Sequence, residues 1–434
     1  MLVYSHKITP RVRYIFKVLL GDMLGLDVSF EGNRQAFLES SEPKLSYTHS
    51  AVENELYFKS HGLLHDTGVK DQSVKVVTGE NGKYFYAVQS ERSALLFDAF
   101  AASFFLLTRY EECLPHIRDH YNRFEAAESL AFKNDFLTEP VVDQWVLKIK
   151  EIILKAYPDS VFKDRTYNFI STIDIDNAYA YKHKGFMRTA GAYARSLAKK
   201  NFAEVVERTN VLIGRAKDPY DTYDFQLEIQ KKYNLKTIYF LLLADYGVND
   251  KNVPHYNLQF QSLIKHLADY AEVGIHPGFN SNENSNKLKV EKRRLEKIIH
   301  RPVIKSRQHF LILHLPHTYQ NLIDNDITED HSMGYAAHTG FRAGTCTPYT
   351  FYDLDIEATT NLTVYPFTMM EATLKYYMQL SPEAAKTHIT ELVQKVKDVN
   401  GTFISLWHNE TLSNKTIWEG WRDVFTHMLE VAHV

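Results

Sequence analysis

Two aspartates, Asp174 and Asp176, stand two residues apart at the end of the apolar segment Ser171-Thr172-Ile173. Side chains alternate along a strand with period two, so both carboxylates would face one side of it. Two carboxylates on one face repel each other, and a cation beside them removes that repulsion. A metal ion held by Asp176 could polarise a water molecule, leaving Asp174 to take its proton as a general base. The alternative is that the pair caps a following helix.

Three further segments end on groups that could join such a site. His276 follows Val273-Gly274-Ile275 and precedes a Pro-Gly turn, which could hold its imidazole as a metal ligand or as an ordinary structural residue. Arg307 and His309 follow an apolar run from Val303 and would share one strand face. A guanidinium near Asp174 would orient that carboxylate and favour its charged form, although a surface salt bridge is the common alternative.

The remaining candidates lie further along the chain. Asp330 opens a glycine-punctuated polar stretch that lacks the Gly-Lys-Ser/Thr of a phosphate loop, so it either lines a site or forms a plain turn. His408 ends the apolar segment 402–407. When protonated, His408 could donate to a leaving group or stabilise an oxyanion, or it could simply be buried against Trp407.

These residues end short apolar segments that alternate with helical ones after residue 165. Such alternation predicts a parallel α/β sheet or barrel, whose chemistry gathers at the carboxyl ends of the strands. Asp245 ends one expected strand in the same way. We expect helices at 261–270 and 286–300 and a helical insertion near residues 180–223. The expected strands are 168–174, 236–244, 273–276, 303–310, 362–367 and 402–407.

With 434 residues the chain is too long for one ordinary core, so two domains are expected. We place an N-terminal α+β domain at residues 1–165 and the second domain at 166–434. The first should hold a hairpin of strands 75–78 and 83–88 around an Asn-Gly turn, and helices 94–110 and 141–156. Arg109, Glu111 and Glu112 could form an interdomain contact, but we favour a solvated helix end.

Composition excludes several classes of protein. The net charge of −3 and the pI near 6.7 provide no global field that would attract nucleic acid or an anionic membrane. The two cysteines, Cys113 and Cys346, argue against a disulfide framework and fit a reducing compartment. No signal-peptide pattern and no transmembrane run are present, so a cytoplasmic location is expected. The oligomeric state is left open.

Taken in order, these segments resemble the five motifs of the polysaccharide deacetylases (the NodB-homology family, carbohydrate esterase family 4). The first motif resembles Thr172-Ile173-Asp174-Ile175-Asp176, and the others match the sequence at His276, Arg307 in Arg-Gln-His-Phe, Asp330, and His408 in Leu-Trp-His. The text around Phe97-Asp98-Ala99-Phe100 and Leu107-Thr108-Arg109-Tyr110 is similar to a bacterial subfamily whose members also carry an N-terminal domain of unknown role.

The resemblance implies a distorted (β/α) barrel in which Asp174 is the catalytic base and Asp176 and His276 bind the metal. It also implies that Arg307 supports the base, that Asp330 belongs to the catalytic set, and that His408 is the acid. The family's second motif has another histidine four residues after the first, where this chain has Asn280. Asn280, Ser281 or His309 would therefore have to complete the set around a divalent metal ion, expected to be zinc.

The predicted activity is removal of N-acetyl groups from an amino sugar, in a cell-surface polysaccharide or a lipid-linked precursor of it. Two alternatives stay open. One is a glycan-binding barrel that has lost its metal, and the other is a hydrolase that attacks a different C–N bond on the same scaffold.

Overall fold

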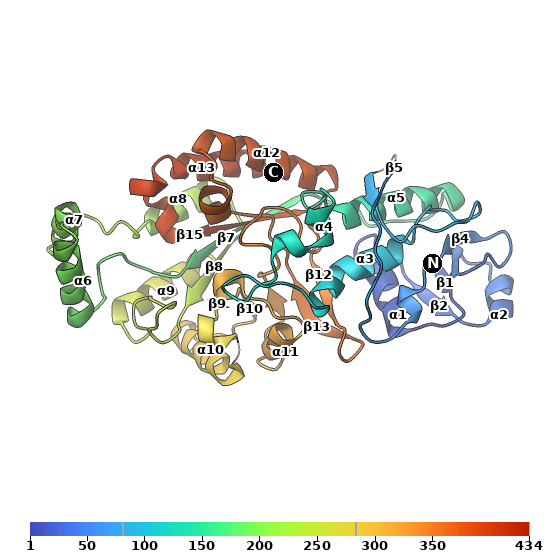
Figure 1. Ribbon diagram of the computed structural model, residues 1–434, viewed down its shortest axis with the longest axis horizontal. Coiled ribbons are helices and arrows are strands. Elements are labelled where there is room, and N and C mark those ends of the chain that lie inside the picture. The colour runs from blue at the N-terminus through green and yellow to red at the C-terminus, as the bar shows by residue number, and fades with distance from the viewer. Residues whose placement is uncertain (80–81, 283, 434) are drawn as a thin grey trace.

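Strand β7 (Asn168–Ile175) runs through the centre of a nine-stranded sheet in the computed structural model, which describes residues 1–79, 82–282 and 284–433. Every residue of β7 after Asn168 is buried, because β8 and β15 pair with it in parallel on both sides and helices cover the sheet. Figure 1 shows helices α12 and α13 above these strands and α9, α10 and α11 below them.

The strand order is β12-β13-β11-β10-β9-β8-β7-β15-β14, and all neighbours are parallel except β12 and β13. This sheet confirms the expected mixed α/β class with a mainly parallel centre. Within the described residues no ladder joins β14 to β12, so closure into a barrel is not confirmed. The bounds are β8 (Thr237–Leu242), β9 (Glu272–His276), β10 (Lys305–Ser306), β11 (Glu329–Asp330), β12 (Tyr349–Asp353), β13 (Ala358–Val364), β14 (Met369–Met370) and β15 (Thr402–His408).

Helix α12 illustrates why the covering helices form where they do. The side chain of Ser381 accepts a hydrogen bond from the Ala384 amide, and Pro382 occupies the first turn. Its buried side chains recur at the spacing of one helix face. The covering helices are α8 (Tyr223–Lys232), α9 (Leu258–Tyr270), α10 (Ser285–Ile299), α11 (His317–Ile323), α12 (Pro382–Asp398) and α13 (Trp421–Ala432).

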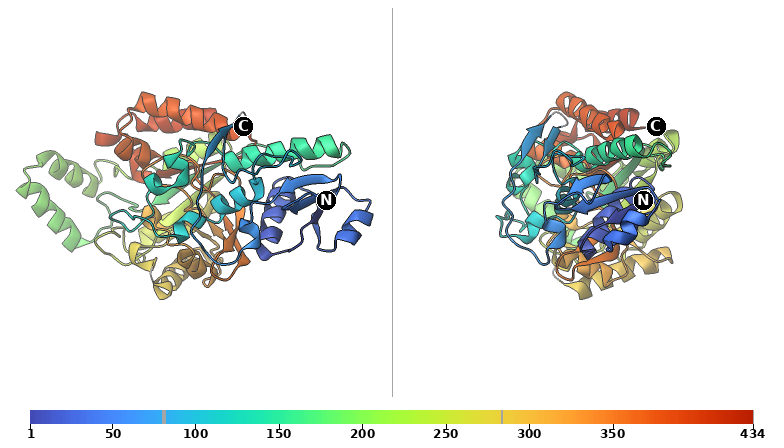
Figure 2. Two further views of the ribbon diagram at one scale, coloured as in Figure 1. Left: turned by 45° about the vertical axis from the view of Figure 1, so that its right-hand side comes forward. Right: turned by 90° about the vertical axis from the view of Figure 1, so that its right-hand side faces the viewer.

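The insertion between β7 and α8 forms a helical hairpin of α6 (Phe186–Ala198) and α7 (Phe202–Leu212). It projects at one end of the long axis of the molecule, opposite the N-terminal sheet (Figures 1 and 2). Within the described residues, every helix is too short or too polar to cross a membrane.

The N-terminal part contains a second sheet of four parallel strands in the order β2-β1-β3-β4, none of which the sequence analysis predicted. Helix α5 has the predicted bounds, whereas α3 is shorter than predicted because Asp98 caps its start and Arg109 turns left-handed after its end. Strands β5 and β6 form the expected hairpin, but Glu80 and Asn81 of its turn lie outside the described residues. The bounds are β1 (Leu2–Tyr4), β2 (Ser29–Glu31), β3 (Lys44–Thr48), β4 (Leu56–Lys59), β5 (Val77–Gly79), β6 (Gly82–Tyr84), α1 (Pro10–Phe16), α2 (Arg34–Glu39), α3 (Ala99–Leu107), α4 (Leu130–Lys133) and α5 (Val141–Ala156).

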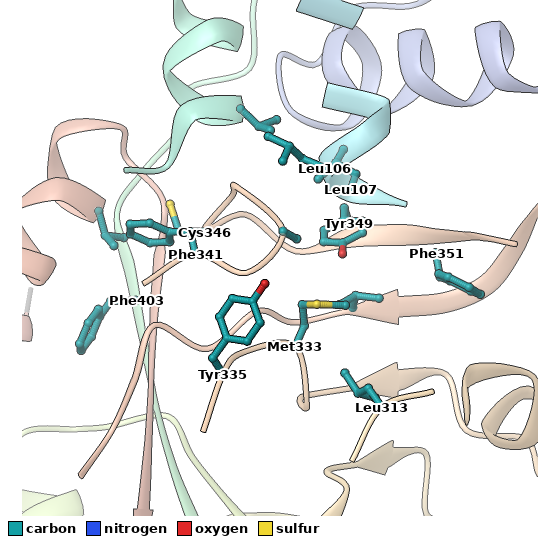
Figure 3. Close-up of a cluster of buried hydrophobic side chains, with 14 of the residues drawn as sticks. Leu106, Leu107, Leu313, Met333, Tyr335, Phe341, Cys346, Tyr349, Phe351 and Phe403 are labelled. Carbon is teal, nitrogen blue, oxygen red and sulfur yellow. The ribbon is translucent and has the colours of Figure 1, made fainter. Parts of the chain in front are cut away.

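The N-terminal part packs on the β12 edge of the large sheet. The hydroxyl of Tyr14 in α1 donates to the Thr350 carbonyl in β12 at 2.8 Å, and Arg11 pairs with Glu357 in the turn after β12. Apolar contact continues through Leu106 of α3, which belongs to the same buried cluster as Phe341 and Tyr349 (Figure 3).

A buried ion-pair network accompanies this apolar contact. Glu112 accepts hydrogen bonds from Arg109 Nε at 2.7 Å and from Arg342 Nε and Nη2 at 2.9 and 2.7 Å. Arg109 and Glu112 are almost fully buried. The prediction of a solvated helix end at Arg109, Glu111 and Glu112 was therefore wrong, because the partner Arg342 lies 230 residues away, beyond any local pattern.

Candidate functional site

Four strands of the large sheet, β10, β9, β7 and β15, bring the predicted site residues to one edge of it. Asp176 directly follows β7, His276 ends β9, Arg307 directly follows β10, and His408 ends β15. Parallel strands place their carboxyl ends on the same side, so side chains far apart in the sequence meet there. The register pairs His408 with Asp174 across β15 and β7.

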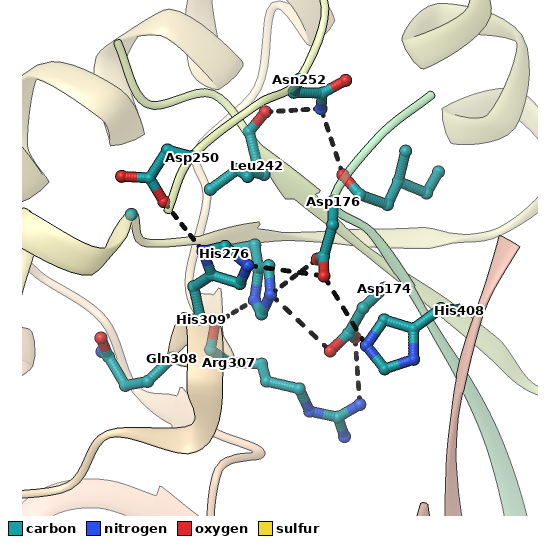
Figure 4. A network of polar contacts seen from close by, with 12 residues as sticks. Asp174, Asp176, Leu242, Asp250, Asn252, His276, Arg307, Gln308, His309 and His408 are labelled. Carbon is teal, nitrogen blue, oxygen red and sulfur yellow. Dashed lines mark hydrogen bonds and ion pairs between the residues drawn. The ribbon is translucent and has the colours of Figure 1, made fainter. Parts of the chain in front are cut away.

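Asp176, His276 and His309 form a group of potential metal ligands whose donor atoms all lie within 4.8 Å of one another. Asp176 Oδ1 lies 3.1 Å from His276 Nε2, and Asp176 Oδ2 lies 3.4 Å from His309 Nε2 (Figure 4). Both histidines are buried. Among the described residues no group makes a hydrogen bond to the buried Oδ1 of Asp176.

In each histidine, the ring nitrogen that faces away from Asp176, Nδ1, already has a hydrogen-bond partner. His276 Nδ1 lies 2.5 Å from the Arg307 carbonyl oxygen, which can only accept, so Nδ1 carries the hydrogen and leaves the Nε2 lone pair facing Asp176. His309 Nδ1 lies 2.8 Å from Asp250 Oδ1. Two oriented imidazoles and one carboxylate with an unpartnered oxygen are a donor set that fits a divalent ion such as zinc with an open position.

The charges within this group stabilise one another. Burial alone would raise the pKa of Asp176, but the neighbouring charge of His309 holds it well below its ordinary value. Burial alone would lower the pKa of His309, but Asp176 and Asp250 raise it to about 9. A divalent cation would take the place of the proton on His309, because metal ligands bind in their deprotonated form.

His309 reaches the centre from a loop and not from a strand. Strand β10 ends at Ser306, and His309 begins the short 3-10 helix η6 (His309–Leu311), in which Phe310 has a φ of 59°. The prediction that Arg307 and His309 share one strand face was therefore wrong. The irregular backbone turns His309 towards Asp176, while Arg307 points to Asp174 (Figure 4).

Asp174 is buried and lies beside an equally buried cation. Arg307 Nη1 is 3.1 Å from Asp174 Oδ1 and donates to Thr172 Oγ1 at 2.6 Å. The guanidinium is also fixed by the His331 carbonyl at 3.0 Å and lies over the Phe240 ring at 4.7 Å. A guanidinium held on several sides keeps the carboxylate beside it oriented.

His408 faces Asp176 on the other side of the centre, with Nε2 at 3.7 Å from Asp176 Oδ2. Its Nδ1 lies 2.7 Å from the buried carboxylate of Glu371. Burial would lower the pKa of His408, but Glu371, and more weakly Asp176, raise it well above its ordinary value. These carboxylates therefore favour the protonated form of His408, which is the form that can donate a proton.

The other predicted residues lie apart from this cluster. Ser281 donates to Glu291 at 2.6 Å, and Asn280 is exposed. The buried carboxylate of Asp330, at the end of β11, accepts hydrogen bonds from the hydroxyls of Ser306 and Ser332. It therefore connects the end of β10 to the loop that follows β11. Asp245 is exposed and pairs with Arg294.

Two carboxylates of this region were missed by the sequence analysis. Glu371 directly follows β14, a strand of two residues that is too short for an apolar pattern to mark its end. Asp250 lies in the loop after β8, which carries no local signal either. Asn252 in the same loop donates to the carbonyls of Ile175 and Leu242 and so ties the ends of β7 and β8 together (Figure 4).

Comparisons with known proteins assign a family model to the part of the chain that holds the four-stranded sheet. The model of a family of unknown function (DUF7033) matches residues 1–158. No curated protein matches the chain.

Several solved structures are similar to part of the chain at low identity. A polysaccharide deacetylase candidate from Mycobacterium smegmatis is 13% identical with a TM-score of 0.39, over 62% of this chain and 86% of that one. A polysaccharide deacetylase from Bacillus cereus is 13% identical with a TM-score of 0.30, over 61% and 86%. A carbohydrate esterase family 4 pseudoenzyme from Bacillus anthracis is 14% identical with a TM-score of 0.30, over 62% and 63%. Likeness at this level carries no argument about activity.

Proposed function

We propose that this protein is a metal-dependent hydrolase that removes N-acetyl groups from amino sugars of a polysaccharide or its precursor. The observation that carries the proposal is the Asp176, His276 and His309 donor group with a buried Asp174–Arg307 pair on one side and the His408–Glu371 pair on the other. Residues 166–434 would form the hydrolase part, and residues 1–165 would support it from the β12 edge.

Each side chain has a distinct task in this proposal. Asp176, His276 and His309 would hold a divalent ion, which supplies Lewis acidity for the acyl carbonyl and the attacking water. Asp174 accepts the proton of that water, and Arg307 keeps its carboxylate in position. His408 donates a proton to the amine nitrogen as it leaves, and Glu371 holds the imidazole in place.

The donor set supports zinc over a hard cation such as Mg²⁺. Two of the three protein ligands are imidazole nitrogens, which zinc prefers, whereas Mg²⁺ prefers an all-oxygen shell with several waters. His309 takes the part of the second imidazole ligand that Asn280 does not supply.

The test combines metal content with turnover. Protein purified without chelator should contain about one divalent metal ion per chain and should release acetate from N-acetylated amino-sugar oligomers. Asp174→Asn should keep the metal and the fold but lower kcat by roughly 10²–10⁴. Asp245→Asn, at an exposed carboxylate, is the matched control and should leave kcat unchanged.

Three outcomes would contradict the proposal. Undiminished turnover by Asp174→Asn would exclude Asp174 as the base. Sugar binding without stoichiometric metal would favour a degenerate glycan-binding protein. Cleavage of cyclic amides, with acetylated amino sugars left intact, would favour a different C–N hydrolase.

A further inference from the structure

A large pocket lies between the helical insertion and the loop that follows β15. Its volume is about 610 Å³, and its wall includes Asn177 and Glu410. Asn177 directly follows Asp176, and Glu410 lies two residues after His408. This pocket, which we call the insertion pocket, therefore begins at the edge of the candidate metal centre and extends towards α6 and α7.

The wall of the insertion pocket is cationic, although the whole chain has a net charge of −3. Six of its described side chains are lysine or arginine and three are glutamate. Arg208 pairs with Glu204 at 2.5 Å, and Lys415 pairs with Glu207 at 2.6 Å. The cations left without an acidic partner among the described residues are Lys184, Arg188, Arg195 and Lys251.

Two of these cations are held in fixed positions. Arg188 donates to the carbonyls of Asn252 and Lys251 at 2.9 and 2.6 Å and lies over the Tyr246 ring at 4.3 Å. Lys184 donates to the side chain of Asn177, the neighbour of Asp176. Burial, and then the neighbouring charge of Arg188, lower the pKa of Lys184 to about 7, and Asp218 and Glu410 offset this only in part. An anion beside it would restore its charge.

Aromatic side chains supply the other part of the wall. Tyr181, Tyr220, Tyr376 and Trp418 line the pocket, and the rings of Tyr376 and Trp418 lie 5.3 Å apart at an angle of 79°. Flat amphipathic rings suit the apolar faces of sugars, while unpaired lysine and arginine suit phosphate or carboxylate.

We propose that the insertion pocket binds an anionic group, phosphate or carboxylate, carried by the saccharide whose acylated amino sugar lies at Asp174 and Asp176. This inference rests on the proposed function and narrows its substrate class to acidic amino-sugar glycosides. The preference arises largely from the insertion, since α6 provides Arg188 and Arg195 and Lys184 lies just before it.

Binding measurements test the inference without relying on turnover. Calorimetry with the Asp174→Asn protein would compare three ligands: α-N-acetylglucosamine 1-phosphate, a disaccharide of glucuronic acid and N-acetylglucosamine, and the neutral methyl glycoside of N-acetylglucosamine. At least one acidic ligand should bind about tenfold more tightly than the neutral one, and the better of the two identifies the group as phosphate or carboxylate. Equal affinity for all three would overturn the inference.

Variants of the lysine and arginine side chains test whether the preference for an acidic ligand arises in the insertion pocket. Lys184→Met should remove most of the preference for the acidic ligand and leave the affinity for the methyl glycoside within about twofold. Arg195→Met, at an exposed position, should lower the affinity for the same acidic ligand. It is the variant to measure if Lys184→Met does not fold. The control Lys199→Met removes an exposed charge outside the pocket and should change neither affinity. An unaltered preference in both pocket variants would contradict the assignment, whereas acid-selective binding without hydrolysis would contradict only the proposed function.

Discussion

His309 Nδ1 lies 2.8 Å from Asp250 Oδ1, and this contact directs the opposite ring nitrogen towards Asp176. Asp250 also accepts from the Phe279 amide at 3.1 Å, so one carboxylate connects the loops that carry His276 and His309. A carboxylate behind a ligating histidine fixes its orientation and makes it a stronger ligand.

Replacing Asp250 should therefore weaken metal binding more than it weakens the fold. We expect Asp250→Asn to lower zinc affinity by roughly 10–100-fold, measured by competition with a chromogenic chelator. Asp245→Asn, in the same loop but exposed, should leave the affinity unchanged. Equal affinities for the two variants would show that His309 does not depend on Asp250.

Glu371 should act on catalysis through His408. Without its carboxylate the imidazole loses both its anchor and the negative charge that keeps it protonated. We expect His408→Gln to lower kcat by roughly 10²–10⁴, and Glu371→Gln by a smaller factor, with KM changed little in either. Steady-state kinetics on one acetylated oligosaccharide would measure the effects on kcat and KM separately. A rise in KM alone would assign His408 to substrate binding.

The buried network around Glu112 should stabilise the contact between the two parts of the chain. Glu112→Gln leaves Arg109 and Arg342 buried with no carboxylate between them, and removal of one partner from such a pair costs about 3–5 kcal/mol. The midpoint of urea unfolding should fall clearly. Glu128→Gln, which breaks a more exposed pair with Lys133, should change stability by less than about 0.5 kcal/mol.

The same network predicts how stability depends on pH. Burial alone would raise the pKa of Glu112, but Arg342 and Arg109 lower it from 4.5 to about 2. A carboxyl group with a lowered pKa contributes fully above its ordinary pKa, and its contribution disappears as the pH falls towards the folded value. The difference in unfolding midpoint between the wild type and Glu112→Gln should therefore be constant above pH 5 and shrink between about pH 4.5 and 2. A difference that does not change with pH would contradict this account.

The sequence predicted those parts of the site that follow regular strands. Asp174, Asp176, His276 and His408 lie where apolar segments end, and parallel pairing brings those ends together. His309 was named only as one of three alternatives, because its direction depends on the irregular backbone at Phe310. No local pattern marks Asp250 as its partner, since the two residues meet only through folding.

The N-terminal sheet was missed for a related reason. Strands β1 and β2 have only three residues each, too few for an alternating pattern to show. The apolar helix α3 was predicted because its signal is local, but its packing partners are distant in the sequence. Phe100 packs on Phe16 and Phe58, and Phe104 packs on Tyr352, and such contacts leave no local trace. Figure 3 shows the end of this helix beside Tyr349.

The hydrogen bond from Tyr14 to the Thr350 carbonyl has a consequence for aggregation. Strand β12 is the longer of the two edge strands of the large sheet, and its backbone would otherwise offer a template for pairing with another chain. The N-terminal part covers that edge, while the opposite edge strand, β14, has only two residues. A fragment restricted to residues 166–434 would expose β12, and its expected fate is intermolecular strand pairing even where every site residue is present.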